Sequence, residues 1–136
     1  MTNAPDAWVI HSEHDGSIGA TGVWCQNWKG FCTPAVDCAV WRLSDDPETA
    51  ERIARAAEAR LGVPFDMSFN LSETNALYCT EFVRAAVNEA LGEERIGTFR
   101  KRGIVFVPVD ACYPAGGSLV FDACSNAVEC ARTQTR

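Results

Sequence analysis

Cys79 is the residue of this sequence whose position best suits it to covalent chemistry. The apolar spacing from about Leu77 to Leu91 predicts an α-helix, and Cys79 falls in its first turn. Free backbone N–H groups and the helix dipole favour an anion there, so we expect an activated thiolate nucleophile. The same N–H groups are placed to donate to an oxyanion during acyl transfer. The alternative is a buried core cysteine, because Cys79 also lies on the apolar stripe of that helix.

Three other side chains are candidates for a supporting or substrate-positioning role: Tyr78, Glu81 and Asp66. Glu81 lies in the first helical turn, where its carboxylate stabilises the positive end of the helix dipole. So close a carboxylate would disfavour a thiolate unless it points away. We expect Tyr78 to pack over the site or to donate a hydrogen bond. Asp66 is predicted either to line the cleft or to cap a turn.

A thiol nucleophile needs a base, and the chain has two histidines, His11 and His14. His11 ends a predicted strand, Ala7–His11, and a predicted turn follows at Glu13–Gly16. Either histidine would serve as the base if its strand lies beside the helix start. We predict His11 as the catalytic partner and favour a surface position without a role for His14.

The other six of the seven cysteines allow a second function class. Cys25, Cys32 and Cys38 together with a histidine could form a site in a small Cys/His metal-binding protein. Zinc sites usually contain Cys-x-x-Cys pairs, and none is present. An odd cysteine count without a signal peptide also argues against a disulfide framework. We therefore expect buried, apolar cysteines, no metal and no cofactor.

Charge and hydropathy exclude several partners. The formal net charge is −6 and no cluster of Lys and Arg stands out, which argues against nucleic acid. No apolar run is long enough to cross a bilayer, and residues 1–6 are polar, so we expect a cytoplasmic protein without an integral membrane segment.

The order of the expected elements predicts a single α+β domain over residues 1–136, in which an antiparallel sheet packs against two main helices. An acidic cap and Pro47 at the first helical position indicate where the first of these helices begins. The expected elements are strands at Ala7–His11, Ser17–Trp24, Val36–Leu43, Ile104–Val109 and Leu119–Phe121, a helical turn within Trp24–Phe31, helices from Pro47 to about Leu61 and from Leu77 to Leu91, and a loop at Phe65–Thr74.

Four segments, in order along the chain, resemble the YiiX/YebB-like hydrolases, a permuted branch of the NlpC-type papain-like superfamily. Tyr-Cys-Thr-Glu-Phe-Val at 78–83 is similar to that family's Tyr-Cys-Ser-Glu-Leu-Val signature. Pro-Phe-Asp-x-x-Phe at 64–69 resembles its Pro-Tyr-Asp-x-x-Phe segment. Val-Pro-Val-Asp at 107–110 resembles the segment that follows its cysteine helix, and Ala-Val-Trp-Arg-Leu at 39–43 resembles the strand before its first helix.

The resemblance implies a circularly permuted papain-like fold and a cysteine hydrolase or acyltransferase. The thiolate of Cys79 would attack an amide or ester carbonyl of a small-molecule, peptide or acyl-lipid substrate, while a histidine moves the proton and a third residue orients it. Val-Ile-His at 9–11 resembles the orienting position of related permuted enzymes. Their base would then lie on a strand before Met1.

Three interpretations of the missing base stay open. The chain lacks its N-terminal strand, or His11 or His14 serves as the base, or the protein is an inactive binding module of the same fold. An absent first strand would leave an open sheet edge beside Ala7–His11, and such an edge predicts a homodimer or poor solubility.

Overall fold

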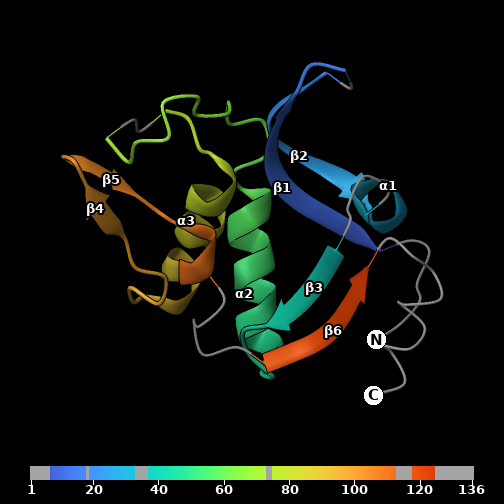
Figure 1. The fold of residues 1–136 in the computed structure, drawn as a ribbon. Helices are drawn as coiled ribbons and strands as arrows, with labels where there is room; N and C mark the ends of the chain where they lie inside the picture. The colour runs from blue at the N-terminus through green and yellow to red at the C-terminus, as the bar shows by residue number, and fades with distance from the viewer. Residues whose placement is uncertain (1–6, 18, 33–36, 73–74, 113–117, 125–136) are drawn as a thin grey trace.

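In the part of the chain that the structure describes, the strands pair as three separate antiparallel ladders beside two central helices (Figure 1). A computed structural model describes residues 7–17, 19–32, 37–72, 75–112 and 118–124. In chain order the elements are β1 (Trp8–Asp15), β2 (Ala20–Asn27), α1 (Trp28–Cys32), β3 (Asp37–Arg42), α2 (Pro47–Glu58), α3 (Cys79–Leu91), β4 (Phe99–Lys101), β5 (Ile104–Phe106), the 3-10 turn η1 (Val109–Ala111) and β6 (Ser118–Cys124).

The hairpin of β1 and β2 forms one wall of the site. The two strands pair over their whole length, and the segment after α2 covers the other edge of β2. There the Val23 N–H donates to the Val63 carbonyl at 2.8 Å. Gly22 allows this approach, because a Cβ at position 22 would lie 2.1 Å from the same carbonyl oxygen. The hairpin is thereby joined to the segment that leads toward α3.

α2 begins and α3 ends at the capping residues that the sequence predicts. Asp46 caps α2, since its carboxylate accepts from the Thr49 backbone N–H at 3.0 Å and from the Thr49 hydroxyl at 2.6 Å. α3 ends at Gly92, whose left-handed backbone (φ 66°) suits glycine. The two helices pack against each other, and Arg60, just after α2, forms an ion pair with Glu89 of α3.

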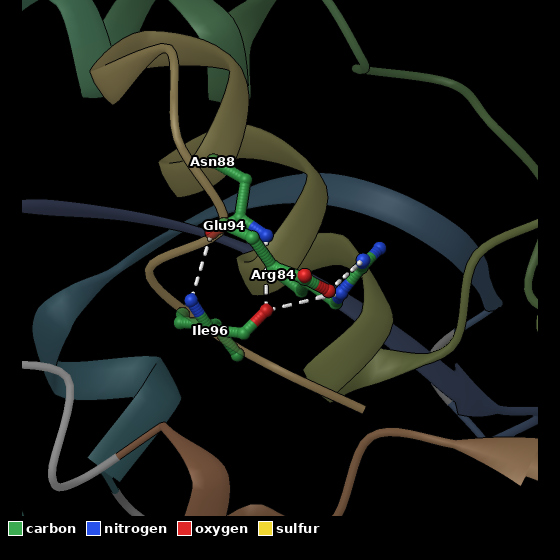
Figure 2. A network of polar contacts seen from close by, with 4 residues as sticks. All are labelled: Arg84, Asn88, Glu94 and Ile96. Atoms are coloured by element: carbon green, nitrogen blue, oxygen red, sulfur yellow. Dashed lines mark hydrogen bonds and ion pairs between the residues drawn. The ribbon is translucent and has the colours of Figure 1, made fainter. Parts of the chain in front are cut away.

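The turn after α3 is held by a polar network, which Figure 2 shows in close-up. Asn88 makes two hydrogen bonds of 2.9 Å with the backbone of Ile96, one to its N–H and one to its carbonyl. Arg84 donates to the same carbonyl at 3.1 Å and pairs with Glu94 at 3.0 Å. Ile96 is fully buried in a core with Tyr78, Val87 and Val107. The network therefore fixes the turn that leads into β4 and β5.

Most expected elements are found, with different lengths. Antiparallel pairing and the two helices confirm the α+β prediction, although the expected single sheet is three two-stranded ladders in the described residues. The predicted turn at Glu13–Gly16 begins too early, because pairing continues to Asp15, opposite Ala20. The predicted strand Ile104–Val109 is too long, since Pro108 lacks an N–H group and η1 follows it. β4 was not expected.

Candidate active site

Cys79 is the first residue of α3, and its side chain is exposed. The prediction that Cys79 lies in the first turn of this helix is confirmed, although the helix begins two residues later than expected, and the alternative of a buried core cysteine is wrong. An open cleft of about 710 Å³ lies in front of Cys79, and both His11 and His14 line it as well. Position, exposure and an adjoining cleft are three properties that a thiol nucleophile requires.

The residues on either side of Cys79 are buried and held by one backbone segment. The Val107 N–H donates to the Tyr78 hydroxyl at 2.8 Å, and the Thr80 hydroxyl donates to the Val107 carbonyl at 2.6 Å. We call these two hydrogen bonds the Val107 clamp. Because successive side chains of a helix start point in different directions, anchoring Tyr78 and Thr80 in the core leaves Cys79 directed outward.

Glu81 and Asp66 make local hydrogen bonds, and those of Asp66 decide between its two predicted roles. The Glu81 carboxylate accepts from the Tyr78 backbone N–H at 3.2 Å, as in a capping box, and is buried. Asp66 is also buried and does not line the cleft. It accepts from the Ser68 N–H at 2.8 Å, the Ser68 hydroxyl at 2.5 Å and the Asn70 N–H at 3.3 Å, so it caps a turn.

Strand β1 is tied to the start of α3 by Ser12. The buried Ser12 hydroxyl donates to the Leu77 carbonyl at 2.6 Å, two residues before Cys79. Side chains alternate along a strand, so His14 lies on the same face of β1 as Ser12, and His11 lies on the opposite face. The His14 ring lies 6.0 Å from the ring of Phe65, which also borders the cleft.

His11 is the better-held of the two histidines. One ring nitrogen lies 3.1 Å from the Gln26 side-chain oxygen, and the other lies 3.6 Å from the Glu13 carboxylate. Its ring also packs against Trp24 at 5.5 Å and Phe31 at 4.9 Å between centroids. These contacts fix the ring orientation, which is what an orienting or proton-transferring histidine needs.

Burial raises the pKa of two groups near Cys79, the Tyr78 phenol and the Cys112 thiol. Burial raises the pKa of the Tyr78 phenol above its usual value, so this hydroxyl stays protonated at neutral pH. Burial also raises the pKa of the Cys112 thiol, and the charge of Cys79 adds to that shift. Cys25, in contrast, is exposed like Cys79 and is a natural reference thiol.

The alternative Cys/His metal site does not form among the residues that the structure describes. Within those residues, no three His, Cys, Asp or Glu side chains come together as a ligand set. Cys25 is exposed and Cys32 is half-buried, and the side chain of Cys38 lies outside the description. Every helix in the same residues is too short or too polar to span a bilayer.

Several site residues escaped sequence reasoning. Ser12, Thr80 and the Val107 backbone position the helix start, and Gln26, Phe31 and Phe65 border the cleft. Nothing in the sequence singled out Ser12, which follows the predicted strand Ala7–His11 and has polar residues on both sides. No pattern in the sequence marks the backbone groups of Val107 as partners of residues nearly thirty positions earlier.

An exposed cysteine at the first position of a helix, beside a hairpin of antiparallel strands, agrees with a papain-like scaffold in permuted order. Residues 2–103 match the family described as "Permuted papain-like amidase enzyme, YaeF/YiiX, C92 family", well over half of the chain. The chain therefore belongs to this family of permuted papain-like amidases, and the family and fold predicted from its sequence are confirmed.

One solved structure supports the fold independently. The chain is similar to the structure titled "Crystal structure of metalloprotein yiiX from Escherichia coli O157:H7, DUF1105", with a TM-score of 0.65 and 19% sequence identity. The match covers 75% of this chain and 72% of that one. No curated protein matches the sequence significantly.

Proposed function

We propose that this protein is a thiol-dependent hydrolase or acyltransferase in which Cys79 attacks the carbonyl carbon of an amide or ester. The observation that carries the proposal is the exposed thiol at the first position of α3, in a cleft that it shares with two histidines. Membership of an amidase family supports the hydrolase class. The helix start favours the thiolate and supplies N–H donors for the oxyanion.

A histidine of β1 is the base in this proposal. His14 lies on the face of β1 that Ser12 joins to α3, whereas His11 has the ring that its neighbours hold in place. One histidine accepts the thiol proton and returns it to the leaving group, and the other contributes to the polar wall of the cleft. Tyr78, Glu81 and Asp66 act by positioning the helix start and the loop before it.

The test is the pH dependence of alkylation of each cysteine, read by mass spectrometry. We expect Cys79 to react fastest, with a half-maximal rate at a pH well below about 8.5, the model value for a thiol. Cys25 reports an ordinary exposed thiol, and the half-buried Cys112 should react slowest of the three. His11→Gln and His14→Gln then identify the base, because only loss of the base moves the Cys79 profile to higher pH.

The rival function is an inactive binding module of the same fold. It predicts that Cys79 and Cys25 alkylate with the same pH profile and that neither histidine substitution changes it. A metal-dependent role, which the description of the related yiiX protein as a metalloprotein raises, predicts a stoichiometric metal in the purified protein. Elemental analysis measures this directly.

A further inference from the structure

The hairpin of β4 and β5 gathers three positive charges at one edge of a protein whose formal net charge is −6. Arg100 and Lys101 end β4, Arg102 follows in the turn, and all three are exposed. Figure 1 shows this hairpin on the far side of α3 from β1 and β2, with its turn pointing away from the helices. The sequence contains no Asp or Glu from residue 95 to residue 109. The positive charge at this edge is therefore not offset by acidic residues of the same segment.

The three basic side chains of the hairpin also lack acidic partners elsewhere in the described part of the chain. Among those residues, no ion pair or side-chain hydrogen bond involves Arg100, Lys101 or Arg102. Other arginines pair with glutamates: Arg55 with Glu51, Arg60 with Glu89, Arg84 with Glu94 and Arg95 with Glu93. The hairpin cations are therefore available to an external anion.

Backbone geometry makes the charged turn a defined feature of the fold. Arg102 and Gly103 both have positive φ, 51° and 78°, as in the two-residue turns that suit the twist of a hairpin. The loop before α3 holds the hairpin from the side of β5, since the Leu71 N–H donates to the Val105 carbonyl at 3.1 Å. Three basic residues in a row do not stand out along the sequence, but this turn projects them together.

Exposed apolar side chains lie beside these charges. Phe99 is 58% exposed and Ile104 is 47% exposed. Side chains alternate along a strand and Lys101 pairs with Ile104, so Phe99, Lys101 and Ile104 share one face of the hairpin. Phe69 is 48% exposed and borders the same hollow of the surface as Ile104. Exposed aromatic and aliphatic side chains next to Lys and Arg are typical of segments that lie in a membrane interface.

We propose that the β4–β5 hairpin docks this protein on the surface of an anionic phospholipid bilayer. The three cations contact lipid phosphates, while Phe99 and Ile104 enter the boundary between headgroups and acyl chains. The rest of the chain carries a net charge of −9, because the −6 of the whole includes the three positive charges of the hairpin. An anionic surface repels that remainder, so the hairpin approaches first. Nucleic acid fits less well, because Ile104 cannot stack on bases and three cations neutralise few phosphates.

The test is co-sedimentation of the protein with vesicles of phosphatidylcholine alone and of phosphatidylcholine mixed with phosphatidylglycerol. We expect binding to the mixed vesicles only, and weaker binding as salt screens the charges. A basic residue near an anionic surface strengthens binding about fivefold, so Arg100→Gln combined with Arg102→Gln should weaken it roughly twentyfold. Phe99→Ser should weaken it at least about threefold, because less apolar area enters the interface.

Matched variants distinguish the hairpin from the charge of the whole protein. Arg52→Gln combined with Arg55→Gln makes the same change in net charge at two exposed positions of α2 and should leave vesicle binding nearly unchanged. Leu61→Ser is the control for Phe99→Ser, because Leu61 is 46% exposed and lies outside the hairpin. Hydrogen–deuterium exchange of the unmodified protein locates the contact independently of any variant. Mixed vesicles should protect the amides of residues 99–106 and leave those of β1 and β2 unchanged.

Each contrary outcome overturns the membrane-docking hairpin. Equal weakening by the two arginine pairs shows attraction by net charge alone, and equal binding to both vesicle types removes the role of the cations. Absence of vesicle binding, with binding of a duplex oligonucleotide that Arg100→Gln and Arg102→Gln abolish, assigns the hairpin to nucleic acid instead. None of these measurements depends on the reactivity of Cys79, so the proposed hydrolase and the hairpin stand or fail separately.

Discussion

Removing the Tyr78 hydroxyl should destabilise the protein and disturb the nucleophile at the same time. Tyr78→Phe leaves the buried Val107 N–H without the acceptor that it has at 2.8 Å. An unsatisfied buried donor costs about 1–3 kcal/mol. For a chain of 136 residues, an unfolding entropy of about 2.1 cal/mol/K per residue converts this into a fall in Tm of roughly 3–10 °C. Urea unfolding followed by fluorescence, with calorimetry for Tm, measures both quantities.

The second hydrogen bond of the Val107 clamp makes the prediction sharper. Thr80→Val removes the donor to the Val107 carbonyl with little change in shape. Both substitutions act on the same residue, so we expect a coupling energy of at least about 0.5 kcal/mol in the double-mutant cycle. Thr21→Val, at an exposed strand position, is the matched control and should change stability by less than about 0.5 kcal/mol. The reasoning fails if Tyr78→Phe is as stable as this control, or if the Cys79 alkylation rate is unchanged in both clamp variants.

Three further predictions concern the elements that position the site. Gly22→Ala should cost about 1–3 kcal/mol by urea unfolding, because the added Cβ meets the Val63 carbonyl at 2.1 Å; Gly16→Ala, with no atom within 4 Å, should be neutral. Asn88→Ala should lower the free energy of unfolding by about 2 kcal/mol, because it deletes two hydrogen bonds to a part-buried turn. A loss below about 0.5 kcal/mol would contradict the network of Figure 2. Hydrogen bonds from Thr49 lower the pKa of the Asp46 carboxyl below 3.8, its ordinary value. The contribution of Asp46 to the stability of the fold is therefore present above pH 3.8 and is lost as the pH falls through the folded-state pKa. The Tm difference between wild type and Asp46→Ala should therefore narrow in acid, and a pH-independent difference would count against the cap.

Local signals in the sequence were sufficient to predict the two main helices. Asp46 and the proline after it begin α2, and Gly92 ends α3. Both signals act through contacts within a few residues. The position of Cys79 followed from the same local logic. Its exposure did not, because the apolar stripe alone is compatible with burial. The contacts of Tyr78 and Thr80 with the backbone of Val107, just after β5, settle which side chains face the core.

The strands were harder to predict, because pairing is not a local property. β4 has three residues, Phe99–Lys101, and its partner is recognisable only through the tight turn at Arg102 and Gly103, both with positive φ. β1 extends past its expected turn because its partner strand continues opposite it. The homodimer predicted for an open edge beside this strand remains a prediction, which light scattering tests.

The choice between the two histidines shows most clearly what sequence spacing cannot supply. His11 and His14 are three residues apart, so the strand pleat places them on opposite faces, yet both border the same open cleft. A resemblance in sequence singles out His11, whereas the Ser12 hydrogen bond to Leu77 orients the face of His14 toward the cysteine helix. Chemistry adds a constraint, because the base must lie on the side of the thiol from which the leaving group departs. Both histidines border the β1 cleft together with Cys79, so the alkylation profiles of His11→Gln and His14→Gln are what decide between them.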